Sequence, residues 1–364
     1  MDLCLYHPEY GYYMRGAGRT GKQGDYFTSS DLHPIFARLI ARQAAEMWAA
    51  LSRPASFTWV EMGAGRGLFA ADFLDWARKT LPDFCQALHY VAIEPGIHQR
   101  DRLMEALKRR LPFEYLRNRV CITQDIGSLA PVTGCFFSNE LVDAFPVHVV
   151  TRSNGCLKEL YVTQEKNELQ EVFGPLSSPG IATYVARYAN HVEEGQRTEV
   201  SLRATQWMHS VAEKLVKGFV LTIDYGDLAE RLYSSERRAG TLMAYRRHAV
   251  SENFYDAPGE QDLTAHVNFS ALIDAGNPVG LEVAGYTTQE RFLIALGEIN
   301  EFADLYQGSH NEAEKLQARM QLKRLIFPGG MGNVFKILIQ YRSVPAPRLT
   351  GLKYARAASY GSPP

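Results

Sequence analysis

Short apolar runs alternate with longer segments of helical periodicity along this chain. Runs rich in Val, Ile, Phe or Tyr predict buried strands at residues 57–63, 88–95, 120–126, 135–141 and 219–225. Helical stretches at residues 68–80 and 97–110 separate the first three of these runs. An alternation of strand, helix and strand predicts a parallel sheet with helices on both faces.

The C-terminal part of the chain follows a different pattern. Residues 281–287 and 334–341 predict two further strands, which we expect to pair as an antiparallel hairpin. The insertion between them is helical over residues 289–325, as RFLIALGEINEFADLY and then EAEKLQARMQLKRLIF, and ends at a Pro-Gly-Gly stop signal. The fold expected is therefore an α/β sheet of roughly seven strands, followed from residue 344 by a frayed tail.

Two regions interrupt the alternation. Residues 151–215 predict a hairpin around Ser153-Asn154-Gly155 and then helical segments. Residues 227–280 are rich in Arg, Tyr, His and Gly, and no period dominates them. Before the first strand, the pattern predicts a helix over residues 34–50.

Composition and charge exclude several classes of protein. Of 364 residues, 46% are hydrophobic and 22% are charged, the balance of an ordinary globular protein. The net charge of −1 argues against a general nucleic-acid binder, which must neutralise phosphates. No apolar run approaches the roughly 18 residues that a membrane helix needs, so we expect no membrane insertion.

The five cysteines are scattered and odd in number, without a CxxC pair. Neither a zinc site nor a disulfide framework is indicated, and buried free thiols in a reducing compartment are favoured. No HExxH motif is present, and we predict no metal site. The first residues resemble neither a signal peptide nor a transit peptide. The sequence thus predicts a cytoplasmic protein.

A glycine-rich turn follows the first predicted strand and carries the strongest chemical signal. Glu61 precedes Gly63, Gly65 and Gly67, and glycines let a backbone turn tightly beside a ligand. The helix that follows offers free N–H groups. A dinucleotide fingerprint reads G-x-G-x-x-G, and its pyrophosphate disfavours a nearby carboxylate. A carboxylate suits the sulfonium and amino group of S-adenosylmethionine instead, although a tight turn without a ligand is the alternative.

The next two strands also end on acidic residues. Glu94 closes the second strand, where a carboxylate can accept both hydroxyls of a ribose. Asp125 and Ile126 close the third strand, where an acid and an apolar neighbour can hold an adenine. A single acid at the end of a strand is often a helix cap. Three in order favour S-adenosylmethionine as cofactor, with S-adenosylhomocysteine as product.

The fourth predicted strand ends in Ser-Asn-Glu-Leu-Val-Asp at residues 138–143. Glu140 and Asp143 are three residues apart and would share one face of a helical turn. Two carboxylates there can clamp a guanidinium by bidentate, charge-assisted hydrogen bonds. We therefore predict Glu140 and Asp143 as catalytic residues and Asn139 as a cofactor contact. Capping of a following helix by Asn139 or Asp143 is the alternative.

Three further features are candidates for the site. Gly24, Asp25 and Tyr26 suit a loop that covers the cofactor, with Tyr26 near the substrate; the alternative is that the residues just after them cap a helix. Asp224 and Tyr225 end the fifth strand on the side where ligands bind. His266 lies in a stretch that is polar at alternate positions and can reach the substrate, although a structural role is the commoner one for a lone histidine.

Eight segments along the chain resemble the MidA-type methyltransferases, the family of the mitochondrial complex I assembly-factor protein arginine methyltransferase. The resemblance is carried by LYHPEYGYYM at 5–14, GDYFTSSDLHPIFARLIARQ at 24–43, VEMGAGRG at 60–67, SNELVDAFPVH at 138–148, LTIDYG at 221–226, GTLMAYRRH at 240–248, DLTAHVNFSAL at 262–272 and MGNVFKIL at 331–338. It implies a seven-stranded, Rossmann-like S-adenosylmethionine fold with added helices and loops. In mitochondrial members it implies arginine methylation of a respiratory-chain subunit.

We accordingly expect five segments along the chain. Residues 1–50 form a segment covering the cofactor and a helix, 51–150 the first part of the core, 151–215 an insertion, 216–343 the rest of the core, and 344–364 a tail. The expected reaction is methylation of arginine in a protein substrate. Alternatives are methylation of a small molecule or of RNA, or a catalytically inert assembly chaperone that binds the cofactor. The oligomeric state is open.

Overall fold

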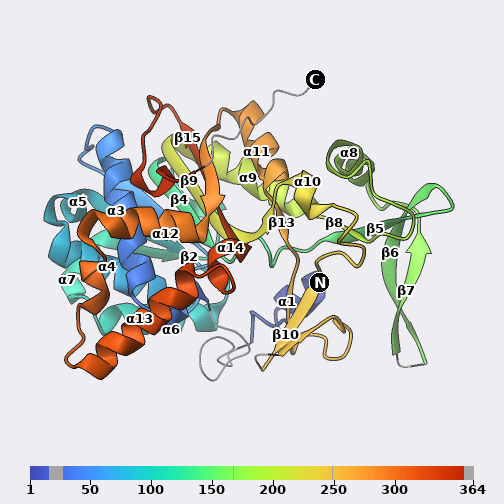
Figure 1. Cartoon of the computed structure of the whole chain (residues 1–364), viewed down its shortest axis with the longest axis horizontal. Helices are drawn as coiled ribbons and strands as arrows, with labels where there is room; N and C mark the ends of the chain where they lie inside the picture. The colour runs from blue at the N-terminus through green and yellow to red at the C-terminus, as the bar shows by residue number, and fades with distance from the viewer. Residues whose placement is uncertain (16–27, 167, 248, 356–364) are drawn as a thin grey trace.

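A large central sheet forms the core of the computed structural model, which describes residues 1–15, 28–166, 168–247 and 249–355. In the described chain its strands follow the order β14-β15-β9-β4-β1-β2-β3, and a short β13 pairs with β9 (Figure 1). The bounds are β1 Phe57–Met62, β2 Leu88–Ile93, β3 Val120–Thr123, β4 Val132–Asn139, β9 Leu215–Asp227, β13 Val267–Asn268, β14 Glu282–Thr288 and β15 Phe335–Arg342. The predicted seven-stranded sheet is thus confirmed, with β13 added.

Strand directions also follow the prediction. Strands β3, β2, β1, β4 and β9 run parallel to one another, whereas β15 is antiparallel to both β9 and β14. The predicted C-terminal hairpin is therefore confirmed. Because all five parallel strands end at one edge, the loops after β1, β2 and β4 come together there.

Helices cover both faces of the sheet. Because side chains at successive strand positions point to opposite faces, a single strand can contribute to an apolar cluster on each face. In β9, Phe219 and Leu221 belong to the larger apolar cluster and Val220 to the second cluster. The larger cluster includes residues of α3 Ile35–Ala50, α4 Leu68–Thr80, α5 Pro82–Ala87, α6 Ile97–Lys108, α7 Phe113–Arg119, α12 Gln289–Gly297 and α13 Glu312–Ile326. The second cluster lies beneath α9 Leu202–Lys214 and α11 Phe269–Gly276.

The insertion after β4 forms a second sheet with the order β7-β6-β5-β8. Its bounds are β5 His148–Ser153, β6 Cys156–Glu165, β7 Glu168–Gly174 and β8 Thr198–Val200, and α8 spans Pro179–Tyr188. The predicted turn is confirmed, because Ser153 pairs with Cys156 across it. Strands β6 and β7 project from the body of the molecule at the right of Figure 1.

Residues 227–280 are more regular than the sequence indicated. Beyond α10 Ala229–Leu232 they contain a small sheet of β10 Met243–Arg246, β11 Ala249–Ser251 and β12 Asp262–Thr264, in the order β11-β10-β12. Its apolar residues pack with α1 Asp2–Tyr6, near the N-terminus in Figure 1. The strands are too short for a two-residue period to appear in the sequence, and packing against α1 holds them.

The C-terminal insertion contains the two helical stretches expected, but the first is shorter, since α12 ends at Gly297 and 3₁₀ turns follow before α13 begins at Glu312. Two other expectations need correction. The tail does not fray over residues 344–355, since Gly351 N donates to Gln43 Oε1 at 3.0 Å and Thr350 bonds Glu46. Among the cysteines, Cys85 and Cys135 are buried, whereas Cys121 and Cys156 are exposed.

Candidate functional site

The turn between β1 and α4 is built on three glycines with left-handed backbone. The φ angles are +74° at Gly63, +51° at Gly65 and +74° at Gly67, which precedes the first residue of α4. A Cβ on Gly67 would overlap Leu103, and one on Gly63 would lie 2.9 Å from Leu141 Cδ1. At Gly65 a Cβ would meet no described atom within 4 Å. Gly63 and Gly67 are therefore needed for packing, while Gly65 presents bare backbone to the space beside it.

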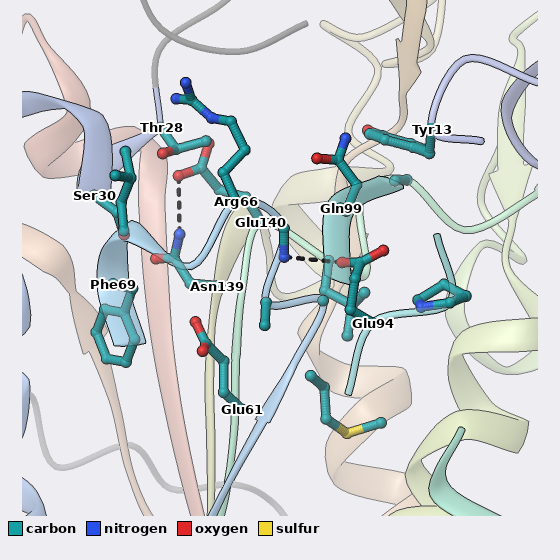
Figure 2. A pocket seen from close by; sticks show the side chains of 18 of the residues that line it. Tyr13, Thr28, Ser30, Glu61, Arg66, Phe69, Glu94, Gln99, Asn139 and Glu140 are labelled. Carbon is teal, nitrogen blue, oxygen red and sulfur yellow. Dashed lines mark hydrogen bonds between the residues drawn. The ribbon is translucent and has the colours of Figure 1, made fainter. Parts of the chain in front are cut away.

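Glu94 ties this turn to the end of β2. Its Oε2 accepts a hydrogen bond from Gly65 N at 2.8 Å (Figure 2), and its Oε1 accepts one from Gly96 N at 2.9 Å. Burial raises the pKa of this carboxyl, and the two N–H donors oppose the rise. Glu94 therefore fixes the position of the glycine turn and also lines the cavity beside it.

Glu61 is a second buried carboxyl at this edge. It is 5% exposed, and the Tyr90 hydroxyl donates to its Oε2 at 2.7 Å. Burial raises the pKa of Glu61 to about 8. A carboxyl in this setting keeps its proton at neutral pH until a cation is near.

Glu61, Gly63, Gly65, Glu94 and Asn139 line one cavity, which we call the larger cavity. Other lining residues were not predicted from the sequence: Tyr13, Asp31, Arg66 and Gln99. Figure 2 shows Tyr13, Arg66 and Gln99 reaching the cavity from separate elements. Arg66 forms an ion pair with Asp31, which joins the glycine turn to α2 Ser29–Leu32. Residue types such as these are common on protein surfaces, so the sequence alone does not mark them as lining a cavity; their tertiary contacts do.

Two amide oxygens at the larger cavity are buried without a partner among the described residues. They are Asn139 Oδ1 and Gln99 Oε1. Buried acceptors are usually satisfied, and an unpaired one calls for a donor from a ligand or water. The amino group and hydroxyls of S-adenosylmethionine supply such donors. Together with the buried Glu61 and the bare backbone at Gly65, these acceptors fit that cofactor.

Other predicted cofactor contacts lie elsewhere. Asp125 is exposed and caps a 3₁₀ turn, accepting from Ser128 N at 3.1 Å, while Ile126 packs against the second apolar cluster. Neither is among the residues that line the larger cavity. Their role in adenine binding stays a prediction. The predicted Gly24, Asp25 and Tyr26 lie outside the described residues.

Glu140 directly follows β4 and points towards the N-terminal part of the chain. Its backbone is left-handed, with φ +54°, and its Oε1 accepts from Ser29 N at 3.0 Å and, as Figure 2 shows, from Asn139 Nδ2 at 2.9 Å. Burial raises the pKa of Glu140 to about 8. The side chain therefore links α2 to the end of β4 beside the larger cavity.

No helix follows β4, so the expected helical turn from Glu140 to Asp143 is wrong. The backbone instead turns around Asp224, whose Oδ2 accepts from the N–H groups of Leu141, Val142 and Asp143 at 3.2, 2.8 and 3.4 Å. These N–H groups donate to a side-chain carboxylate and not to the backbone carbonyl groups that would accept from them in a helix. The capping alternative for Asn139 and Asp143 fails for the same reason.

Glu140 and Asp143 nevertheless meet at a second, smaller cavity. Its walls carry three carboxyl groups, from Glu140, Asp143 and Asp262, three phenol rings, from Tyr13, Tyr225 and Tyr245, and the side chain of Thr264. Tyr13 and Glu140 also line the larger cavity, so the two spaces adjoin. Burial and three neighbouring acids raise the pKa of Asp143 well above its usual range.

The remaining predicted site residues, Asp224, Tyr225 and His266, lie at or near the smaller cavity. Tyr225 lines the smaller cavity, whereas Asp224 lies behind its wall and positions the loop. His266 lines neither cavity; its ring stacks on Tyr225 and its Nδ1 is 3.0 Å from Arg237 Nη1. Burial lowers the pKa of His266 to about 4, so it is neutral, and its substrate role stays a prediction.

Comparison with known proteins identifies the family. Residues 39–287, more than half of the chain, match the model of a family of S-adenosyl-L-methionine-dependent methyltransferases. The chain belongs to this family. The resemblance to MidA-type enzymes noted in the sequence is thereby confirmed, and S-adenosylmethionine is the cofactor.

Named relatives are similar over nearly the whole chain. The mitochondrial protein arginine methyltransferase NDUFAF7 of Xenopus tropicalis is 26% identical over 374 residues, covering 96% of this chain and 82% of the relative. That of Homo sapiens is 24% identical over 386 residues, covering 100% of this chain and 83% of the relative. A Burkholderia thailandensis crystal structure bound to S-adenosyl-homocysteine has a TM-score of 0.86 and 28% identity, covering 98% of this chain and 90% of that one.

Two findings concern other kinds of site. In the described parts of the chain, no group of three or more His, Cys, Asp or Glu side chains is placed to hold a metal ion. Nor does any described helix combine the length and the apolar character needed to cross a membrane. The cytoplasmic location stays a prediction.

Proposed function

We propose that this methyltransferase modifies arginine in a protein substrate, and that the smaller cavity receives the guanidinium. The observation that carries the proposal is a pocket of three carboxyl groups and three phenol rings directly beside the larger cavity. Carboxylates bind a guanidinium through paired hydrogen bonds, and aromatic faces attract its delocalised charge. No described Lys, Arg or His lines the pocket, so a cationic substrate would meet no repulsion from its lining.

The larger cavity would hold S-adenosylmethionine. Glu61, Asn139 and Gln99 would accept hydrogen bonds from it, and Glu94 would hold the glycine turn against it. When bound, this cofactor supplies an activated methyl group on a sulfonium, so that orientation of the acceptor is the main task left to the protein.

Glu140 and Asp143 would orient the guanidinium at the boundary between the two cavities. Glu140 lines both spaces, and its Oε1 is already held by Ser29 and Asn139. Paired carboxylates would hold charge away from the nitrogen that faces the larger cavity. The raised pKa of both carboxyls falls when a cation enters, so substrate binding and their ionisation are coupled.

Charge-neutral variants test this assignment. Glu140→Gln and Asp143→Asn keep the shape of the side chains, so we expect S-adenosylhomocysteine affinity to change little. Methyl transfer to arginine should fall by about 10²-fold or more, the scale expected when orientation is lost. Both quantities are measured on the same purified proteins, by calorimetry and by mass spectrometry of a cell extract treated with labelled S-adenosylmethionine.

Other outcomes contradict the proposal in different ways. Unchanged transfer in both variants would mean that these carboxyls do not hold the acceptor. Label on RNA or on small molecules would identify another class of acceptor. Cofactor binding without labelled product in the wild-type protein would favour an inert assembly factor.

A further inference from the structure

The smaller cavity is assembled from two separate parts of the chain. The sheet core supplies Glu140, Asp143 and Tyr225. The other side chains come from residues 1–15 and from the small sheet of β10, β11 and β12, which together we call the cap. Its contributions are Tyr13, Tyr245, Asp262 and Thr264.

The cap is a packed unit with a fixed relation to the core. Leu5 and Tyr12 share an apolar cluster with Ala244 and Leu263, and Ala144 of the core joins them. The Tyr6 hydroxyl donates to Ala144 O at 3.0 Å. These contacts lie next to Asp143, so they set how the cap's side chains face the core carboxyls.

Asp262 is the acidic residue that the cap places in the cavity wall. It lies on β12, is 2% exposed and pairs with Tyr245 across the ladder to β10. The Tyr13 hydroxyl donates to its Oδ1 at 2.7 Å. This hydrogen bond holds the carboxyl side chain in one orientation. Asp262 also lies near Asp143, whose pKa it helps to raise.

We propose that Asp262 is a specificity-determining residue, the third carboxylate around the guanidinium, and that it makes the site select arginine over lysine. The inference rests on the proposed function. A guanidinium presents five N–H donors in a rigid planar fork, whereas a lysine ammonium presents three donors from one point. Glu140 and Asp143 can satisfy either cation. A third carboxylate, fixed by Tyr13 on another part of the wall, adds a partner that the larger planar cation can reach.

The chain offers a matched control for Asp262. Glu260 lies two residues earlier, its side chain is 51% exposed, and it pairs with Arg246 at 3.1 Å. It lines neither cavity. Asp262→Asn and Glu260→Gln each remove one negative charge from the same segment, but only the first changes the cavity. Tyr13→Phe removes the hydroxyl that holds Asp262 and leaves its carboxylate.

The test uses the full chain saturated with S-adenosylhomocysteine. Calorimetry measures the affinity for N-acetyl-arginine methylamide and for its lysine counterpart, together with the affinity for S-adenosylhomocysteine as a check on folding. We expect Asp262→Asn to lose about tenfold or more in arginine affinity, the scale of one charge-assisted bond, with lysine affinity nearly unchanged. Tyr13→Phe should lose less, and Glu260→Gln should match the wild type.

Each failure has a separate meaning. If the wild type prefers arginine and Asp262→Asn keeps that preference, the inference is wrong while the proposed function stands. Equal losses in Asp262→Asn and Glu260→Gln would show a general charge effect and also overturn the inference. If the wild type binds arginine no better than lysine, and a labelled extract contains no methylarginine, the proposed function fails as well.

Discussion

Asp224 and Asp143 show how the surroundings of a buried carboxyl decide what it can do. Asp224 is fully buried, and its two oxygens accept hydrogen bonds from four backbone N–H groups. Its carboxylate oxygens therefore already accept hydrogen bonds from the backbone, most of them from the loop after β4. Asp143 lies against other acids at a cavity wall instead. The first carboxyl is therefore a positioning residue, and the second is available to a ligand.

Glu61 should make cofactor binding depend on pH. Burial raises its pKa to about 8, so a proton must leave before the carboxylate can pair with a cationic ligand. We expect S-adenosylmethionine affinity to rise between about pH 6 and pH 8, by up to about tenfold per pH unit. Calorimetry at several pH values measures this rise, which Glu61→Gln should flatten. A parallel rise in the variant would assign the effect to another group.

Two glycines lie where β1, β4 and β9 pair with one another, and a side chain at either position would overlap the backbone of the neighbouring strand. Gly134 has φ +154° and Gly218 φ +134°; a Cβ on Gly218 would overlap Gly134 O, and one on Gly134 would overlap Thr58 O. These positions lie near the start of β4 and β9. Glycine at these positions is therefore compatible with the register of β4 and β9, which continues to Asn139 and Ile223 beside the site.

Substitution of Gly218 tests this requirement for glycine. Gly218→Ala should destabilise the fold by about 2–4 kcal/mol, since it adds backbone overlap to the cost of left-handed backbone. Gly195→Ala is the control, because Gly195 has φ +74° and no described atom within 4 Å of its Cβ position. It should cost about 1–2 kcal/mol. Urea unfolding gives both values, and equal costs would mean that the strands move apart without penalty.

Across the whole molecule, the buried acids of the site oppose folding as the pH rises. Glu61 and Glu140 have pKa values of about 8, and burial raises the pKa of Asp224 to about 7. Above about pH 4.5 an unfolded chain loses these protons while the folded chain keeps them. Unfolding then releases protons, so the free energy of unfolding falls as pH rises towards 8.

Glu140→Gln should remove one part of this dependence. Each such carboxyl contributes up to about 1.4 kcal/mol per pH unit between its unfolded and folded pKa. We expect the free energy of unfolding to fall less steeply in the variant than in the wild type between about pH 5 and pH 8. Urea titrations across that range measure both slopes. Identical slopes would show that Glu140 is ionised in the folded protein.

The strand segments along the chain and the acids at their ends could be predicted from the sequence, because both are local. A buried strand shows as an apolar run, and Glu61 and Glu94 stand directly beside such runs. Residues 289–325 show the limit of this reasoning at the ends of elements. Both helical stretches are present, but α12 ends at Gly297 and two 3₁₀ turns follow it before α13. Glu301 and Phe302 adopt left-handed backbone there, a conformation that these residue types do not predict.

The sequence thus determined the sheet, the glycine turn and the cofactor, since each depends on neighbours in the chain. Tertiary structure decided the rest of the site. Asp262 and Tyr13 are 249 positions apart, yet they share a hydrogen bond at the smaller cavity. Asp224 lies on the adjacent strand β9, and its hydrogen bonds to the backbone of residues 141–143 replace the helical turn that the sequence predicted. Burial and contacts of this kind arise from folding over long separations, and no local pattern of residue types encodes them.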